Sequence, residues 1–156
     1  MSRPGSSGYL VDTDVLSALA PDKPSVPETF VAWLRQNAER LYIPCIAVAE
    51  LEQGICKLRR AGGTARAMRL ATWLDGLLEL YAERILSLDA SACRLAGRIS
   101  DEATAAGRHP GFPDIAIAAL AREADLTVVT RNARHFTSLG APCMDPFAPR
   151  LRSPDA

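Results

Sequence analysis

The stretch Tyr9–Leu19, which reads YLVDTDVLSAL, sets two carboxylates between two kinds of apolar pattern. Leu10 and Val11 end a short apolar run that is typical of a buried strand, whereas the apolar residues after Asp14 recur at helical spacing. In an open α/β sheet, ligands bind outside the carboxyl ends of the strands. Asp12 and Asp14 therefore occupy a junction suited to a binding or catalytic site. Their partners in such a site are expected after other strands of the same sheet.

Strands and helices alternate along the rest of the chain. Further strands are predicted at residues 41–45, 85–88, 126–130 and 143–144. Helices are predicted at residues 28–40, 46–60, 64–83, 89–107 and 114–124, with a short one reaching Phe136. This alternation is typical of an α/β fold in which a short, mainly parallel sheet is covered on both faces.

Size and composition point to one ordinary globular domain. The chain has 156 residues, of which 48% are hydrophobic and 23% are charged. Its 18 basic and 18 acidic residues balance to a net charge of zero. A neutral chain exerts no overall pull on nucleic acid or membrane, so a polyanionic partner would have to be held locally.

The cysteines and the ends of the chain indicate in which cellular compartment the protein is expected. Four cysteines without paired spacing and two histidines disfavour a zinc site and suit free thiols in a reducing compartment. Met1–Gly8 lacks the apolar core of a signal peptide, and no apolar run approaches membrane-spanning length. We therefore expect a cytoplasmic protein without membrane association, and flexible termini at residues 1–8 and 148–156.

Other polar residues fall where a site at the carboxyl edge of the sheet requires them. Glu50 lies in the first turn after the second predicted strand, and Asp114 begins the helix that leads to the fourth. Asn132 follows that fourth strand. These residues can converge with Asp12 if the first, second and fourth strands are neighbours.

Helical spacing separates Glu50 from Glu52. At about 100° per residue, Glu50 flanks the buried stripe beside Ala47 and Gly54, which leave room around its carboxylate. Glu52 falls on the opposite flank beside Arg59, where a solvated ion pair is expected. Glu50 is therefore the better ligand.

Carboxylates packed together raise one another's pKa unless a cation neutralises them. Oxygen ligands without histidine or cysteine suit Mg²⁺ or Mn²⁺, and such ions support the hydrolysis of phosphodiesters. Taken singly, Asp12 and Asp114 could equally serve as a helix cap or a helix-dipole partner, and Glu50 as a surface glutamate. Spacing alone leaves these alternatives open.

Four stretches resemble the motifs of PIN-domain ribonucleases, particularly the VapC-type toxins of bacterial toxin–antitoxin pairs. They are Leu10–Ser17, Ile43-Pro44 with Val48–Leu51 and Gly54-Ile55, Pro113–Ala119, and Val128–Asn132 with Phe136. They occur in the family's order. The resemblance covers residue 9 to about residue 147, and implies a PIN-like α/β/α sandwich over residues 9–147.

The resemblance also implies roles for individual residues. Asp12, Glu50 and Asp114 match the family's metal-binding carboxylates. Asn132 stands where many members have a fourth acid, which puts a second strongly held metal in doubt. Thr130 could hold a carboxylate or a water through its hydroxyl.

Further residues flank this implied site. Asp14 stands where asparagine is usual in the family and could act as an extra acid or hydrogen-bond acceptor. Arg131 and Arg134 could bind phosphate or simply form a solvated basic face. His135 stands where an acid is frequent, and a solvent-facing position is expected for it.

The function implied by the resemblance is endonucleolytic cleavage of RNA by Mg²⁺- or Mn²⁺-activated water. Toxins of this kind usually form homodimers and are inhibited by a cognate antitoxin, for which the apolar segments 30–34 and 70–78 could offer grooves.

Two alternatives stay open. An Asp-x-Asp after a strand also occurs in haloacid-dehalogenase-type phosphatases, but neither lysine of the chain, Lys23 or Lys57, follows a strand in a fitting place. A PIN-like module that binds RNA or a regulator without cutting is the other alternative, motivated by Asn132 and by the zero net charge.

Overall fold

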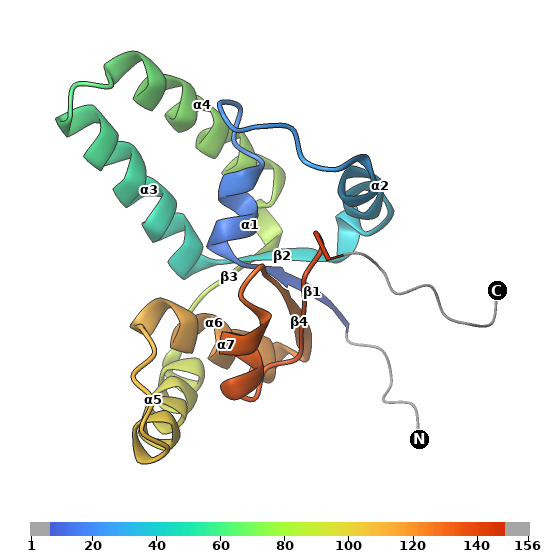
Figure 1. The fold of residues 1–156 in the computed structure, drawn as a ribbon, viewed down its shortest axis with the longest axis vertical. Helices are drawn as coiled ribbons and strands as arrows, with labels where there is room; N and C mark the ends of the chain where they lie inside the picture. Colours follow the sequence, from blue (N-terminus) through green and yellow to red (C-terminus); the bar gives the residue numbers. More distant parts are fainter. Residues whose placement is uncertain (1–6, 149–156) are drawn as a thin grey trace.

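Five parallel strands form one sheet at the centre of the protein, in the order β3-β2-β1-β4-β5 (Figure 1). The computed structural model describes residues 7–148. The strands are β1 (Gly8–Val11), β2 (Leu41–Pro44), β3 (Ile85–Leu86), β4 (Leu126–Val129) and β5 (Cys143–Met144). Strand β1 lies between β2 and β4, so the condition under which the acidic residues converge is met.

Helices cover both faces of the sheet, which confirms the predicted α/β/α fold. They are α1 (Thr13–Ala18), α2 (Glu28–Gln36), α3 (Cys45–Arg60), α4 (Thr64–Leu80), α5 (Ala90–Ala105), α6 (Phe112–Ala124) and α7 (Ala133–Ser138). In Figure 1, α5, α6 and α7 lie on one side of the sheet and α1 to α4 on the other, where α3 and α4 extend as a hairpin. Within residues 7–148, every helix is too short or too polar to cross a lipid bilayer.

The alternation of side chains along β1 divides the core between the two faces. Leu10 packs in the cluster built with α5 and α6, whereas Val11 belongs to the cluster that contains Phe30 and Trp33 of α2. A separate apolar cluster around Leu74 joins α3 to α4. Because β1 is covered on both faces, its carboxyl end is the place where segments from both layers meet.

Two predicted helices end earlier than the sequence pattern suggests. Helix α2 ends at Gln36 and α4 at Leu80, and each is followed by a 3₁₀ turn of sequence Ala-Glu-Arg, at 38–40 and 82–84. Each turn leads directly into a strand, β2 or β3. The tighter turn redirects the chain into the sheet, which helical periodicity alone does not reveal.

The ends of the described region are tied to the core. Strand β1 begins at Gly8, whose register partner is Leu126, and the backbone N–H of Ser7 donates to the carbonyl of Asp125. Near the other end, the ring of Phe147 packs 4.8 Å from that of Phe30. Flexible termini are predicted at residues 1–8 and 148–156, but Gly8 is instead the first residue of β1; residues 1–6 and 149–156 lie outside the described residues.

Candidate active site

Asp12 is the buried centre of the site. It follows β1 directly and caps α1, and its Oδ1 accepts a 2.8 Å hydrogen bond from the backbone N–H of Thr13. Its Oδ2 accepts a 2.8 Å bond from the hydroxyl of Thr130, at the end of β4. The predicted role of Thr130 as the holder of a carboxylate is confirmed. Asp12 is 5% exposed, so its carboxylate is fixed in a largely dry setting.

The pKa of Asp12 is raised to about 7, and burial of the carboxylate is the largest of several causes. The hydrogen bonds from Thr130 and Thr13 act in the opposite direction, because they favour the charged form. The negative charges of Asp14 and Asp114 raise the pKa further. Of the acids predicted to gather around Asp12, Asp114 acts on its pKa, together with Asp14, whereas Glu50 is not among the charges that raise it.

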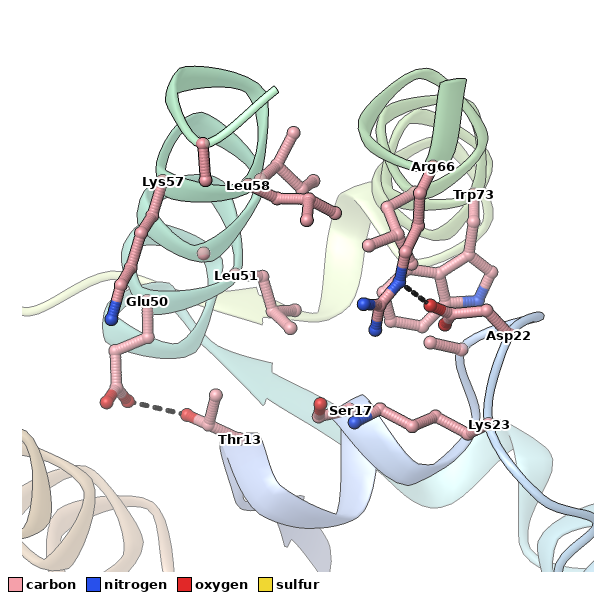
Figure 2. A pocket seen from close by; sticks show the side chains of 15 residues that line it. Thr13, Ser17, Asp22, Lys23, Glu50, Leu51, Lys57, Leu58, Arg66 and Trp73 are labelled. Atoms are coloured by element: carbon pink, nitrogen blue, oxygen red, sulfur yellow. Dashed lines mark hydrogen bonds and ion pairs between the residues drawn. The ribbon is translucent and has the colours of Figure 1, made fainter. Parts of the chain in front are cut away.

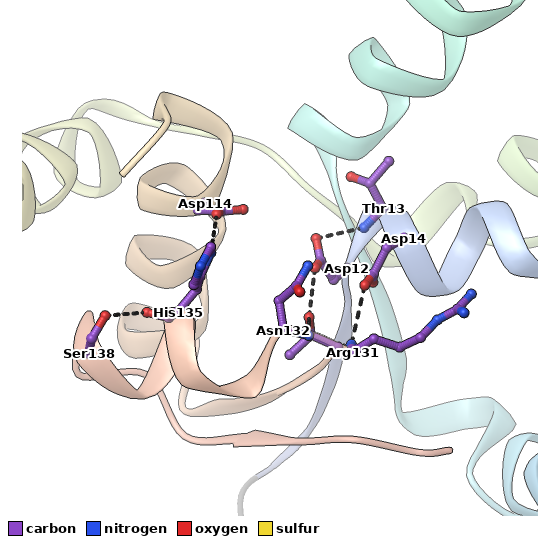
Figure 3. Close-up of polar contacts among 9 residues, drawn as sticks. Asp12, Thr13, Asp14, Asp114, Arg131, Asn132, His135 and Ser138 are labelled. Atoms are coloured by element: carbon purple, nitrogen blue, oxygen red, sulfur yellow. Dashed lines mark hydrogen bonds and ion pairs between the residues drawn. The ribbon is translucent and has the colours of Figure 1, made fainter. Parts of the chain in front are cut away.

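Asp14 and Asp114 approach Asp12 from two different helices (Figure 3). Asp14 Oδ2 accepts a 3.3 Å hydrogen bond from the backbone N–H of Arg131, whereas its buried Oδ1 has no hydrogen-bond partner within residues 7–148. Asp114, near the start of α6, lies with Oδ2 3.5 Å from Nδ1 of His135. The imidazole is 67% exposed, so the expected solvent-facing position is correct, but the ring also faces Asp114.

Glu50 stands on the first turns of α3 and is joined to the site through Thr13 (Figure 2). The hydroxyl of Thr13 donates a 2.6 Å hydrogen bond to Glu50 Oε1. Both residues line a pocket of about 420 Å³ between α1, α3 and α4, with Leu58 and Trp73 on its apolar side. Across the pocket, an ion pair between Arg66 and Asp22 ties α4 to the segment after α1.

The remaining predicted residues surround this edge less directly. The backbone N–H of Asn132 donates to the Thr130 hydroxyl at 3.0 Å. The guanidinium of Arg131 lies 4.6 Å from the centre of the Phe147 ring, so this side chain points away from Asp12 (Figure 3). Arg134 is exposed on α7. Glu52 is exposed and forms no ion pair with Arg59 in the described part of the chain, where the sequence predicts one.

The donor set fits a hard divalent cation. All candidate ligands are carboxylates, the charges of Asp14 and Asp114 raise the pKa of Asp12, and Asp14 has a buried Oδ1 without a hydrogen-bond partner among residues 7–148. Within residues 7–148, however, no three histidine, cysteine or acidic side chains are gathered as a ready-made metal cage. The site therefore fits a divalent cation through the charge and the type of its ligands rather than through a preformed ligand geometry.

Thr13 is the residue of this site that sequence reasoning missed. It contacts Asp12 through its backbone and Glu50 through its side chain. The available signal was a hydroxyl residue placed between two acids at the strand–helix junction.

Comparison with known proteins gives a consistent picture. The family model described as PIN domain matches residues 9–141. Toxin FitB of Neisseria gonorrhoeae is 32% identical over 139 residues, covering 88% of this chain and 97% of FitB. VapC ribonuclease Y4jK of Sinorhizobium fredii is 31% identical over 142 residues, covering 90% of this chain and 98% of Y4jK.

Solved structures agree with these sequences. FitAcB from Neisseria gonorrhoeae superposes with a TM-score of 0.78 at 31% identity, covering 90% of this chain and 99% of the matched one. DNA-bound VapBC from Salmonella typhimurium matches with a TM-score of 0.76 at 26% identity, covering 89% and 98% of the two chains.

Proposed function

This chain belongs to the PIN-domain family, and on that premise we propose that it is the endoribonuclease toxin of a toxin–antitoxin pair, with Mg²⁺ or Mn²⁺ as its cofactor. One observation carries the proposal. Asp12 is a buried carboxylate at the carboxyl end of the central strand, and its pKa is raised to about 7 by burial and by neighbouring acids. Such a site is unfavourable until a cation neutralises it.

Asp12, Glu50 and Asp114 are the residues that would hold the ion. When bound, a divalent cation supplies Lewis-acid polarisation of a phosphodiester and makes water a stronger nucleophile. Neighbouring strands support this proposal for two of the three carboxylates: Asp12 follows β1, and Glu50 lies on α3, which follows β2.

The protein's own residues orient these ligands. Thr130 fixes one oxygen of Asp12, and the backbone of Thr13 fixes the other. Asn132 anchors the Thr130 hydroxyl through its backbone N–H, which leaves the hydroxyl proton directed at Asp12. Arg134, exposed on α7, is our candidate for contact with an RNA phosphate.

A cognate antitoxin and a second copy of this chain are the proposed protein partners. The relatives FitAcB and VapBC are toxin–antitoxin complexes, which supports the first. The apolar lining around Leu58, Leu70 and Trp73 suits an apolar segment of the antitoxin beside Glu50. Of the predicted groove at residues 30–34, Phe30 and Trp33 are instead buried in the core. Homodimer formation would be checked by light scattering of the purified protein.

Purified protein incubated with total cellular RNA tests the proposed activity. Wild-type protein is expected to produce discrete fragments with Mg²⁺ or Mn²⁺ and none with EDTA. Asp12→Asn, Glu50→Gln and Asp114→Asn should each abolish cutting while the fold, followed by circular dichroism, survives. Glu52→Gln, on the other flank of α3, is the matched control and should cut like the wild type.

The outcome separates the proposal from its alternative. Cutting that persists in any acid variant removes that residue from the site. If the wild-type protein neither cuts RNA nor binds Mn²⁺ in a calorimeter, the chain is a non-catalytic PIN module.

A further inference from the structure

Thr13 contacts two of the proposed ligands at once. Its backbone N–H donates to Asp12 Oδ1 at 2.8 Å, and its hydroxyl donates to Glu50 Oε1 at 2.6 Å. Figures 2 and 3 show these two bonds from the first residue of α1. A single residue therefore links the acid at the end of β1 with the acid on α3.

The hydroxyl bond spans 37 positions of the chain, so it is not a local cap of its own helix. Threonine at a helix start commonly bonds a nearby backbone group instead. A distance of 2.6 Å is typical of a hydroxyl that donates to an ionised carboxylate. The bond therefore serves the Glu50 carboxylate rather than the start of α1.

A hydroxyl is also the suitable group for this task. An unrestrained glutamate samples many rotamers, and fixing one costs conformational entropy when a ligand binds. A lysine or arginine would fix the carboxylate equally well, but its positive charge would neutralise the acid and oppose a cation. The neutral Thr13 hydroxyl holds Glu50 without lowering the negative charge of the site.

We infer that Thr13 is a positioning residue, whose hydroxyl fixes the Glu50 carboxylate and thereby sets the affinity of the site for a divalent metal. This inference rests on the proposed function, because it takes Glu50 as a ligand. It extends that function by assigning a residue that acts through Glu50.

Calorimetric titration with Mn²⁺ tests this role without relying on catalysis. Thr13→Val keeps the shape and the backbone N–H but lacks the hydroxyl, and it should weaken Mn²⁺ binding about 10-fold, as loss of a partner of a metal ligand commonly does. Thr13→Ser, which keeps the hydroxyl, should restore the affinity to within about 2-fold of wild type. Ser17→Ala removes another hydroxyl from the same helix and pocket and should bind like the wild type.

A double-mutant cycle with Glu50→Gln identifies the residue through which Thr13 acts. In the Glu50→Gln background, Thr13→Val should cause no further loss of Mn²⁺ affinity. Urea unfolding of each variant verifies that the folded fraction is the same in all titrations.

Two results would overturn the inference. Thr13→Val could bind Mn²⁺ as tightly as the wild type. Alternatively, Thr13→Val could weaken Mn²⁺ binding by the same factor in the wild-type and Glu50→Gln backgrounds. In both cases wild-type binding and cutting would leave the proposed function intact. A wild-type protein that binds no Mn²⁺ would remove both the inference and the proposed metal dependence.

Discussion

Thr130 and Asp12 lie 118 positions apart in the chain and share a buried hydrogen bond of 2.8 Å. The parallel pairing of β1 with β4, in which Val11 is the register partner of Val129, places the two residues side by side just beyond the strand ends. Thr130 is fully buried, and its hydroxyl also accepts the N–H of Asn132. The central acid is thus positioned by the neighbouring strand.

Replacing Thr130 by valine should damage both the site and the fold. The variant leaves Asp12 Oδ2 and the Asn132 N–H without this partner, which we expect to lower the free energy of unfolding by about 1–3 kcal/mol. Because the Thr130 hydrogen bond lowers the pKa of Asp12, its loss should raise that pKa further and slow RNA cutting at neutral pH. Urea unfolding and the initial cleavage rate measure the two effects.

Thr130→Ser is the matched control for this variant. It keeps the hydroxyl and should keep most of the cleavage rate. A Thr130→Val protein that cuts RNA at the wild-type rate would show that the hydrogen bond to Asp12 is dispensable.

The raised pKa of Asp12 predicts a pH-dependent stability of the metal-free protein. In the folded state, Asp12 keeps its proton up to about pH 7, whereas the ordinary pKa of this group, taken for the unfolded chain, is 3.8. The folded state therefore binds more protons between these values, so the free energy of unfolding falls as the pH rises from about 4 to about 7. The slope reaches at most about 1.4 kcal/mol per pH unit.

Asp12→Asn removes this titration and should flatten the profile measured by urea unfolding in EDTA. The variant should be more stable than the wild type at pH 8, where the buried wild-type carboxylate is charged. Asp75→Asn changes an exposed acid of α4 and should leave the wild-type slope. Equal slopes for wild type and Asp12→Asn would contradict the assignment.

Saturating Mg²⁺ should stabilise the wild-type protein at pH 7.5, because a ligand that binds only the folded state raises the free energy of unfolding. Thermal unfolding with Mg²⁺ and with EDTA measures this shift. Asp12→Asn should lose most of it. An equal shift in both proteins would place the bound ion away from Asp12.

Two glycines should respond in opposite ways to alanine. At Gly8 in β1, an added Cβ would lie 2.5 Å from the carbonyl oxygen of Arg40, so Gly8→Ala should destabilise the fold by about 1–3 kcal/mol. At Gly76 within α4, an added Cβ meets nothing within 4 Å, and Gly76→Ala should stabilise it by about 1 kcal/mol. Urea unfolding decides both, and a stable Gly8→Ala protein would contradict the close approach of β1 to Arg40.

The contact between Arg131 and Phe147 should appear as a coupling free energy. With the guanidinium 4.6 Å from the ring centre, a double-mutant cycle of Arg131→Ala and Phe147→Leu is expected to give about 0.5–1 kcal/mol. The cycle is measured by chemical unfolding. Strictly additive effects would mean that the contact contributes nothing to stability.

Much of this fold could be predicted because local pattern and tertiary structure agree. The structure has a strand where the apolar run precedes Asp12 and a helix where the spacing after Asp14 predicts one. Strand β4 spans Leu126–Val129, close to the predicted residues 126–130. Helix ends were harder to predict. At Asn37, the side-chain amide donates to the Trp33 carbonyl at 2.8 Å and helps to end α2, although Ala38-Glu39-Arg40 would suit a longer helix.

The position of Asp12 beside Thr130 could be predicted from the sequence, but the side-chain contacts of the other site residues could not. Asp12 and Thr130 follow neighbouring strands, so topology brings them together. The hydrogen bond between Thr13 and Glu50 depends on how α3 packs against α1. The direction of the Arg131 side chain depends on the packing of Phe147. Such contacts between distant segments leave no periodic signal in the sequence.

The central claim, that a divalent ion at Asp12 is required for cutting RNA, is tested most directly by one Mn²⁺ titration followed in two ways. Calorimetry reports binding, and single-turnover cleavage of one RNA that the protein cuts reports activity. Our account predicts the same midpoint for both curves in the wild-type protein, and loss of both in Asp12→Asn. Cutting that proceeds in EDTA, or that survives in Asp12→Asn, would contradict it.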